Sequence, residues 1–398
     1  MSQTDADAVV VPAIGTGGSL SVIRSLGDAG YTTIAVSEQT DPPSFSSRYC
    51  DRRVRVPSPE TDLGAYAEAL LTLADDDAVG TIVPIREPDV HVLAAHRKEF
   101  ADRIGVLWPT ADRLNAIHDR TRLFAHAERA GVAVPETMPL DEVDDWDKER
   151  IVKARYAILT DDVVDSVPAG TVRAPPKTVF LEPGDEPDIE QLTESMGHVP
   201  ITQAYVDGTE YCFRGLYHEG EAIVTTQKKL VRGYKYPRGP SIYHEAVDDP
   251  ALEAAGRALL DELDYHGLAS VGFIRDDSGT FNLLEINPRV PSSLPMDIHA
   301  GVDYPRYFWQ LATTGAIADE PAYRPGTASH LLRGEAVHLH SVLREEYPLA
   351  TRPSVVLTGY NIVRSLIEEP HFDYLSVDDP QPFIRDLTNT ARSVLSQT

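Results

Sequence analysis

The chain has 398 residues, which at roughly 150 residues per domain is enough for two or three packed domains. It carries 62 acidic side chains against 36 basic ones, a formal charge of −26, and this excludes a generic binder of nucleic-acid phosphates. No apolar run approaches the ~18 residues of a membrane span, and the acidic start of the chain differs from a secretory signal. We therefore expect a cytoplasmic protein with neither a nucleic acid nor a membrane as its partner.

The acidic surplus is a property of the surface, because 42% hydrophobic residues suffice for ordinary cores. Such a composition resembles that of halophilic proteins, in which concentrated cations screen the repulsion. Lysine is rare, and five of the seven lysines fall between positions 153 and 235, either by chance or because compact ammonium groups grip phosphate there. Cys50 and Cys212 match no zinc or redox spacing.

The first third of the chain alternates short apolar strands with helices. This alternation predicts a parallel, doubly wound sheet. The expected strands are 8–14, 32–36, 80–85 and 105–108, and the expected helices are 19–29, 62–73, 89–100, 110–117 and 119–130.

The pattern changes after this region. Residues 141–150 are almost wholly charged and indicate a solvated segment, and residues 160–190 are rich in Pro, Asp and Gly, which favours short strands with loops. The remaining strands are expected at 200–206, 211–217, 221–228, 269–275 and 281–286, and the helices at 250–265, 304–314 and 384–395.

Residues Gly15–Gly18 form a glycine turn between the first strand and the first helix. A dinucleotide-binding loop has glycines at its first, third and sixth positions, but the sixth position here is Leu20. A plain backbone turn and a substrate-anchoring loop are two further interpretations. In the dinucleotide interpretation Glu38 would bind a ribose hydroxyl, which makes an NAD-dependent oxidoreductase one hypothesis; an ordinary acid at a strand end is the other.

The strongest chemical pattern is the segment Leu283–Arg289. Period-two alternation places Glu285 and Asn287 on one face of a strand whose other face carries Ile286. A carboxylate and an amide oxygen so close together suit Mg²⁺, which prefers oxygen ligands and bridges phosphates. Arg289 would follow where negative charge develops. The alternative is a strand end with ordinary polar caps.

Two weaker patterns each allow a simpler interpretation. His338 and His340 would share one face of a strand and could hold zinc, but no third ligand is evident, and ordinary polar strand residues are the alternative. Ser292 and Ser293 lack the glycines of a nucleophile elbow, so no catalytic triad is expected.

Several motifs in a fixed order resemble the ATP-grasp superfamily, in its carboxylate–amine ligase branch related to biotin carboxylase and carbamoyl-phosphate synthase. The resemblance runs from about residue 8 to about residue 315. The motifs are Asp119-Arg120, where the family usually has lysine in second place, Gly131–Thr137, Gln203–Glu210, Gly267–Asp276 and Leu283–Arg289.

This resemblance implies an ATP-grasp fold, with α/β and α+β parts, preceded by a Rossmann-like domain with a parallel sheet. The expected domains are 1–112 for the N-terminal domain, 113–315 for the ATP-grasp domain and 316–398 for a mixed C-terminal extension. Within the ATP-grasp domain we expect a small lobe at about 135–205 and a large lobe at about 206–315.

The resemblance also implies the cofactors ATP and Mg²⁺ (or Mn²⁺). Lys153 and Lys177 would contact phosphates, and Glu210 would bind the ribose. Arg289, Arg232 and Lys229 would face the γ-phosphate and the acyl-phosphate. The adenine would lie against Gln203, Ala204, Tyr205 and Val206.

Gly272 departs from the family pattern, because many members have an acid or glutamine at this position of the strand. Asp276 shares its face but lies four residues along, roughly 13 Å away. Three interpretations are open: Asp276 binds an ion at a shifted position, water takes the place of the missing ligand, or only one Mg²⁺ binds.

Three hypotheses about function follow. The first is an ATP- and Mg²⁺-dependent ligase that phosphorylates a small carboxylate and couples the acyl-phosphate to an amine. The second, motivated by Gly272, is an ATP-binding regulatory protein with weak or no catalysis, and the third is the oxidoreductase. A homodimer is the candidate assembly; neither the carboxylate nor the amine can be deduced from the sequence.

Overall fold

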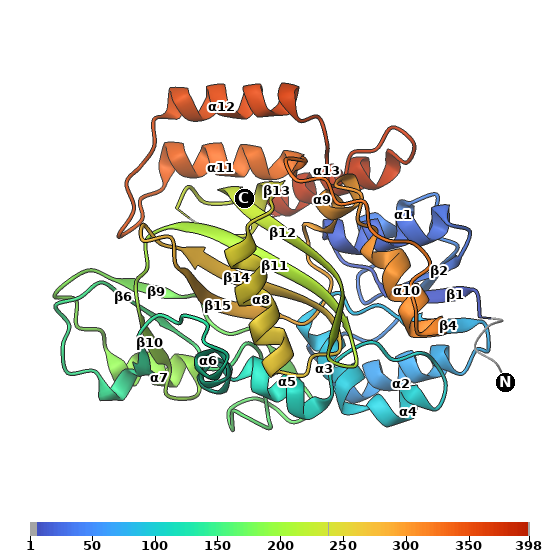
Figure 1. Cartoon of the computed structure of the whole chain (residues 1–398), viewed down its shortest axis with the longest axis horizontal. Helices are drawn as coiled ribbons and strands as arrows, with labels where there is room; N and C mark the ends of the chain where they lie inside the picture. Colours follow the sequence, from blue (N-terminus) through green and yellow to red (C-terminus); the bar gives the residue numbers. More distant parts are fainter. Residues whose placement is uncertain (1–5, 238, 397–398) are drawn as a thin grey trace.

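The computed structural model describes residues 6–237 and 239–396, which form three main sheets flanked by helices (Figure 1). The first sheet is parallel, with the strand order β3-β2-β1-β4. This confirms the parallel sheet expected for the N-terminal part. Its strands are β1 (Ala8–Pro12), β2 (Thr32–Ser37), β3 (Arg52–Arg55) and β4 (Val79–Ile82).

The central strand β1 is buried on both faces because helices cover each side of the sheet. Val9 and Val11 pack into one core with Ile23 of α1 (Gly17–Asp28), whereas Val10 packs into another with Tyr66 of α2 (Leu63–Ala74). A continuous apolar run is therefore the correct sequence for this strand. The first sheet thus presents the loop between β1 and α1 at the carboxyl end of its central strand.

The other two main sheets are antiparallel. A small sheet has the order β5-β10-β6-β9, and a large one the order β15-β14-β11-β12-β13-β16. The strands of the small sheet and of a separate hairpin, β7-β8, are β5 (Thr137–Pro139), β6 (Arg150–Lys153), β7 (Leu159–Thr160), β8 (Val172–Arg173), β9 (Val179–Leu181) and β10 (Ile201–Ala204). Those of the large sheet are β11 (Thr209–His218), β12 (Glu221–Gly233), β13 (Ser241–Ala246), β14 (Gly267–Arg275), β15 (Phe281–Asn287) and β16 (Ala328–His330).

One face of the large sheet is covered by α8 (Pro250–Glu262). Phe213 of β11 contacts Gly256 so closely that an added Cβ would lie 2.1 Å from the Phe213 ring. On the neighbouring strand, Thr225 and Gln227 both hydrogen-bond Glu253 of α8, at 2.9 and 3.3 Å. These contacts fix which residues of each strand face α8 and which face the opposite side.

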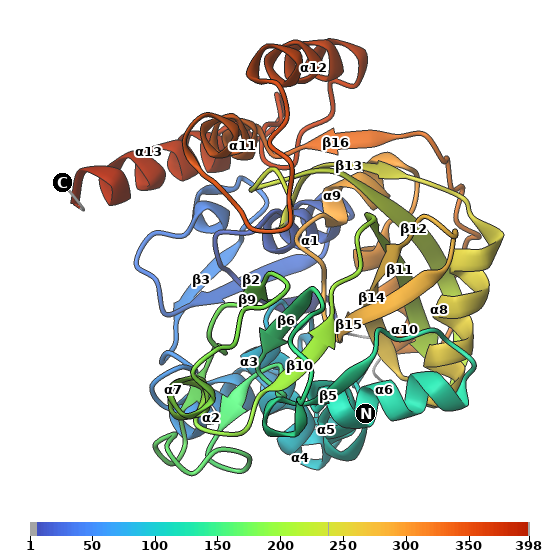
Figure 2. The same cartoon turned by 90° about the vertical axis from the view of Figure 1, so that its left-hand side faces the viewer.

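Helices flank the sheets (Figures 1 and 2). The C-terminal region, expected to be mixed with one last helix, holds three helices, and His338 and His340 lie on a helix instead of a strand. Residues 105–108 form no strand. The helices not yet introduced are α3 (Glu87–Ala95), α4 (Arg97–Ala101), α5 (Ala111–His118), α6 (Arg120–Arg129), α7 (Ile189–Met196), α9 (Leu294–His299), α10 (Tyr304–Thr314), α11 (Leu332–Arg344), α12 (Val355–Glu368) and α13 (Gln381–Ser396), with short 3₁₀ turns η2 (Pro43–Ser46) and η3 (Leu140–Glu142).

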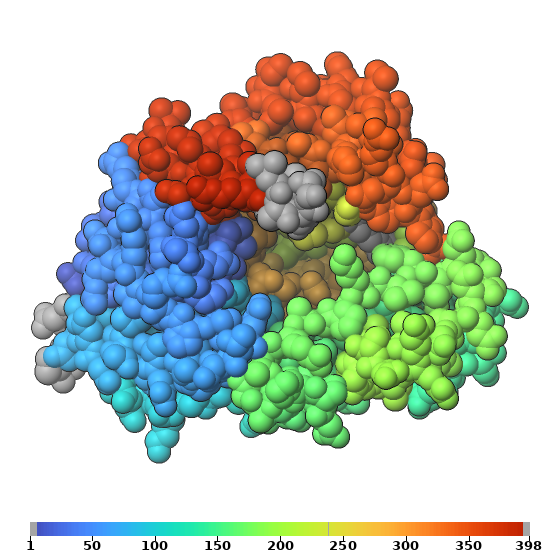
Figure 3. Space-filling model, turned by 180° about the vertical axis from the view of Figure 1, so that it is seen from behind, coloured from blue at the N-terminus to red at the C-terminus, as the bar shows by residue number. Residues whose placement is uncertain are grey.

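The C-terminal region is tied to the first sheet's domain by buried polar contacts. Asp379 accepts hydrogen bonds from Arg24 at 2.9 Å and from Ser47 at 2.7 Å. Seen from behind, the molecule is hollowed between the N-terminal, small-sheet and C-terminal parts (Figure 3). In the part of the chain that the structure describes, none of the helices has the length and apolar character needed to span a bilayer.

Candidate active site

Glu285, Asn287 and Arg289 form a connected polar row along β15 and the residues after it. Asn287 Nδ2 donates to Glu285 Oε1 at 3.2 Å, and Arg289 Nη2 donates to Asn287 Oδ1 at 2.9 Å. The alternate residue Ile286 is buried in the core beneath α8. Strand periodicity therefore separates the polar row from the core, as the sequence predicted.

Glu87 extends this row from another part of the chain. It begins α3, directly after the first sheet, and its Oε1 lies 3.2 Å from Nε of Arg289. Its other oxygen accepts a hydrogen bond from His118 Nε2 at 2.9 Å. Although burial opposes it, the His118 hydrogen bond and the charge of Arg289 hold the pKa of Glu87 below its ordinary value. Glu87 is therefore a carboxylate that fixes the Arg289 guanidinium.

Arg120 connects the polar row to the small sheet. Its Nη2 lies 3.7 Å from Glu285 Oε2, and its Nη1 donates to the Ala154 carbonyl at 2.8 Å. Ala154 directly follows Lys153, the last residue of β6, whose Nζ lies 5.6 Å from the centre of the Phe124 ring. Arg120 thus joins the expected metal residue Glu285 to the end of β6, next to the expected phosphate residue Lys153.

Lys228 shares a face of the large sheet with Glu285. The register pairs Glu285 with Gly272, Gly272 with Cys212, and Cys212 with Lys228. Directly paired residues of antiparallel strands project to the same face, so Lys228 lies across the sheet from Glu285 at three strand spacings, roughly 14 Å. Its Nζ donates to Ser241 Oγ at 2.7 Å. Burial, with the charge of Arg214, lowers the pKa of Lys228 to about 8.

Lys229 and Arg232, two of the expected catalytic residues, lie elsewhere. Lys229 alternates with Lys228 and so projects to the face that Thr225 and Gln227 turn toward α8. Arg232 binds Glu335 of α11 through Nε at 2.9 Å and Nη2 at 2.8 Å. The structure does not bring either side chain to the polar row, because strand parity turns one away and α11 holds the other.

Asp276 is also separate from the metal candidates. Its carboxylate accepts hydrogen bonds from the Ser278 amide at 2.9 Å and the Thr280 amide at 3.0 Å, within the turn between β14 and β15. Hydrogen bonding, first of all from the Ser278 side chain, lowers the pKa of Asp276. A shifted ion at Asp276 has no support in this geometry, since its carboxylate caps the turn four residues from Gly272.

A metal ion at this site would have few protein ligands. Within residues 6–237 and 239–396, no three His, Cys, Asp or Glu side chains gather as a metal-binding group. Glu285 and Asn287 nevertheless supply two oxygen donors on one exposed strand face. This set fits Mg²⁺, which is commonly held by one or two side chains together with substrate phosphates and water. His338 does not belong to such a site, since its Nδ1 lies 2.8 Å from the Gly233 carbonyl oxygen.

The expected nucleotide residues lie along the small sheet and its junction with the large one. Gln203 is buried in β10 and donates to Thr137 Oγ1 at 2.9 Å, and the Ala204 amide donates to the Glu136 carbonyl at 2.8 Å. The other members of this set are Tyr205 and Val206 after β10, Glu210 in β11, and Lys177, exposed between β8 and β9.

The glycine turn packs against the segment that follows Arg289. A Cβ on Gly18 would lie 2.5 Å from the Pro291 carbonyl oxygen, and one on Gly17 would lie 2.9 Å from that of Ser292. Gly17 and Gly18 therefore lie against protein backbone, which favours a structural role for these two glycines over a dinucleotide loop. Glu38 is ion-paired with Arg86 at 2.9 Å.

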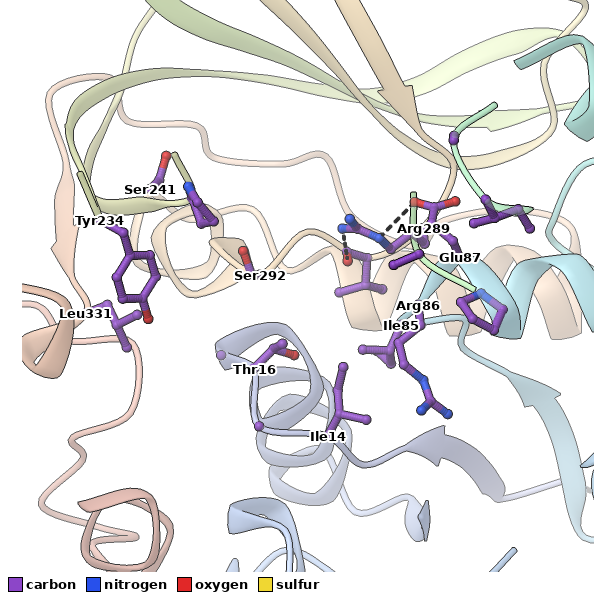
Figure 4. Close-up of a pocket in the computed structure, with 18 of the residues that line it drawn as sticks. Ile14, Thr16, Ile85, Arg86, Glu87, Tyr234, Ser241, Arg289, Ser292 and Leu331 are labelled. Atoms are coloured by element: carbon purple, nitrogen blue, oxygen red, sulfur yellow. Dashed lines mark hydrogen bonds and ion pairs between the residues drawn. The ribbon is translucent and has the colours of Figure 1, made fainter. Parts of the chain in front are cut away.

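A cavity of about 460 Å³ lies where the glycine turn, the polar row and the C-terminal region meet. Figure 4 shows Arg289, Glu87 and Arg86 at one end, Tyr234, Leu331 and Ser241 at the other, and Thr16 and Ser292 between them. Neither Glu87 nor Tyr234 was predicted from the sequence. Glu87 carried a signal, because it follows a buried parallel strand, where ligand sites of such sheets lie.

Similarity to known proteins agrees with this arrangement. A family model described as "ATP-grasp in the biosynthetic pathway with Ter operon" matches residues 200–332. A biotin carboxylase from Nostoc sp. is 24% identical over 310 residues, which are 72% of this chain and 66% of that protein. The chain therefore spans just under two thirds of this curated relative.

Solved structures match over 81% of the chain. The biotin carboxylase domain of Hydrogenobacter thermophilus 2-oxoglutarate carboxylase, described as a dimer with MgADP and bicarbonate, has 17% identity, 73% coverage and a TM-score of 0.59. An L-amino acid ligase from Bacillus licheniformis has 13% identity and a TM-score of 0.59, and the match covers 77% of its chain. Rhizobium etli pyruvate carboxylase has 15% identity and a TM-score of 0.60, but the match covers only 29% of its chain. The chain therefore has the ATP-grasp fold, which follows the N-terminal parallel sheet in sequence.

Proposed function

We propose that this protein is an ATP- and Mg²⁺-dependent ligase that phosphorylates a carboxylate and joins the acyl group to an amine. The single observation that carries the proposal is the polar row Glu285–Asn287–Arg289, which Arg120 connects to the end of β6 beside Lys153. The similarity to biotin carboxylase and L-amino acid ligase structures supports it.

ATP would lie between the small and the large sheet. Lys153 and Lys177 would hold its phosphates, Glu210 its ribose, and the segment 203–206 its adenine. Glu285 and Asn287 would hold Mg²⁺, which when bound neutralises charge on the transferring phosphoryl group.

The chemistry would proceed in two balanced steps. A carboxylate oxygen of the acid forms a bond to the γ-phosphorus as the bond to the β-phosphate oxygen breaks, which gives an acyl-phosphate and ADP. The amine then forms the C–N bond, inorganic phosphate leaves, and the amine proton passes to solvent. Arg289, held by Glu87, would orient the carboxylate and stabilise the acyl-phosphate, and Lys228 would supply positive charge across the sheet.

The regulatory alternative is favoured by one specific observation. Gly272, which pairs with Glu285, offers no ligand, and the Asp276 carboxylate caps a turn instead of replacing it. A protein of this kind would bind ATP and be stabilised by it, yet release no ADP with any carboxylate and amine. ADP release from ATP–Mg²⁺, measured with a panel of acids and amines in molar KCl, separates the two functions.

Lys153→Ala is expected to raise the dissociation constant for ATP by about tenfold to a hundredfold, because a charge-assisted contact to phosphate is lost. A fluorescent-nucleotide titration measures this. Lys148→Ala is the matched control, since Lys148 is an exposed lysine of the same region, 3.9 Å from Asp145. An unchanged dissociation constant for Lys153→Ala would remove its phosphate role.

The activity is expected to fall as the pH rises past about 8. Lys228 has its pKa lowered to about 8, so above this pH it loses the positive charge that would face the phosphates. Lys228→Arg keeps the charge and should move this decline in activity to higher pH. Lys228→Met should abolish most of the activity and, with it, this dependence on pH. Initial rates of ADP release between pH 6.5 and 9.5 test this; the same profile in Lys228→Arg would contradict it.

The homodimer stays a prediction. The 2-oxoglutarate carboxylase domain among the similar structures is described as a dimer. Sedimentation equilibrium of the full chain in molar KCl would measure the assembly directly.

A further inference from the structure

The cavity beside Arg289 has two chemically different ends. The end near the polar row carries Arg86, Glu87 and Arg289, whereas the opposite end carries Tyr234 and Leu331 (Figure 4). The walls between them are largely apolar and include Ile14, Ile85, Ile158, Pro175 and Val290. Such a cavity suits a ligand with one charged head and an apolar body.

At the charged end, Arg289 is the group best able to receive a carboxylate. Arg86 is already engaged by two acids, Glu38 at 2.9 Å and Asp89 at 3.0 Å. The Arg289 guanidinium gives one N–H to Asn287 Oδ1, one to the Val290 carbonyl and one toward Glu87. Since a guanidinium has five N–H groups, two are left over within the described part of the chain, one on each terminal nitrogen. A carboxylate can accept both.

At the opposite end, the charged side chains of Arg333 and Asp373 are held by protein partners. Arg333 is ion-paired with Asp386 at 2.8 Å, and Asp373 accepts a hydrogen bond from Ser329 at 2.5 Å. Burial raises the pKa of Asp373 to about 6. Tyr234 and Leu331 therefore offer mainly apolar surface. Tyr234 directly follows β12 of the large sheet, and Leu331 directly precedes α11.

We propose that the acid activated by this protein is amphipathic: its carboxylate binds at Arg289, and its alkyl or aryl body extends along the cavity to Tyr234 and Leu331. This inference rests on the proposed ligase function and names the class of acid. A cavity of about 460 Å³ holds a small organic acid, and each methylene placed in it contributes about a fourfold gain in affinity.

The test is a series of straight-chain acids from acetate to octanoate, with 3-phenylpropionate, on the full chain with ATP–Mg²⁺ in molar KCl. Hydroxylamine serves as the amine, and the hydroxamate and ADP are both measured. The expected kcat/KM rises about fourfold per methylene until the cavity is full. Tyr234→Ala and Leu331→Ala should lower kcat/KM at least fivefold for hexanoate and 3-phenylpropionate, and less than twofold for acetate.

Tyr360→Ala is the matched control, because Tyr360 lies exposed on α12, away from the cavity. It should leave the whole series unchanged. Equal rates for acetate and hexanoate in the unaltered protein, or an equal loss for all acids in Tyr234→Ala, would overturn the amphipathic class while leaving the ligase function in place.

Failure of the proposed function has a different signature. If no acid supports ADP release, the shift in melting temperature on adding each acid to the ADP–Mg²⁺ complex is measured. If hexanoate shifts the melting temperature and Tyr234→Ala abolishes this shift, the proposed class of acid is retained and the proposed ligase function is overturned. No shift by any acid would overturn both.

Discussion

Glu285→Ala is expected to lower the Mg²⁺-dependent release of ADP at least about a hundredfold. The residue supplies the only carboxylate of the polar row on β15, and Asn287 by itself leaves a divalent cation with one neutral ligand. Loss of a group that stabilises charge in the transition state commonly costs this much in rate. Steady-state kinetics over a range of Mg²⁺ concentrations measures the effect, which should not be recovered fully at high Mg²⁺.

Asp276→Ala is the matched control for this experiment. It removes a carboxylate from the same hairpin, but one that caps the turn through Ser278 and Thr280. Because this turn is exposed to solvent, the variant should lose little stability and change the rate less than twofold. A wild-type rate in Glu285→Ala would remove the metal assignment, and a large loss of rate in Asp276→Ala would restore Asp276 as a candidate ligand.

Arg214→Met is expected to give the largest loss of stability, about 3–5 kcal/mol. Arg214 and Asp297 are fully buried and form an ion pair between β11 and α9, and Thr226 donates to the same carboxylate at 2.8 Å. Removing the guanidinium leaves a buried carboxylate without its cation. Chemical denaturation followed by circular dichroism measures the free energy of unfolding.

The double variant Arg214→Met/Asp297→Leu separates the ion pair from simple packing. Replacing both charges removes the unpaired carboxylate, so most of the lost stability should return. If the double variant is as unstable as Arg214→Met, the loss comes from disturbed packing around α9 instead. A loss below about 1 kcal/mol in the single variant would contradict the assignment of a buried pair.

Local patterns predicted the elements that are buried on a regular period. The run of valines in β1 predicted a strand of the parallel sheet, and the structure shows why the run is continuous, since α1 covers one face of this strand and α2 the other. In β15, the alternation of Glu285, Ile286 and Asn287 predicted one polar face and one core face. The structure confirms both, because Asn287 hydrogen-bonds Glu285 on one face and Ile286 is buried on the other. The C-terminal helices were mostly missed, since several of their apolar residues, such as Val356 and Tyr360, are exposed, and the apolar pattern therefore does not mark one buried face.

The candidate site was predicted only where its residues are close in sequence. Lys228 and Lys229 are adjacent, and only the register of β12 against β11 shows that Lys228 shares a face with Glu285. Glu87 is about two hundred residues from Arg289, and its contact depends on how the first sheet packs on the large one. Arg232 matched a basic motif, but Glu335 of α11 binds it.

The sequence by itself determined the alternation of strands and helices in the first third of the chain, the polar face of β15 and the absence of a strongly basic composition. The first two follow from backbone periodicity, which repeats within a few residues, and the third follows from the composition of the whole chain. Only the tertiary structure decided that Arg120 joins Glu285 to β6, that Glu87 fixes Arg289, and that Tyr234 and Leu331 close a cavity. Such contacts join segments distant in sequence, so they depend on strand register and on the packing of whole sheets, which no local pattern contains.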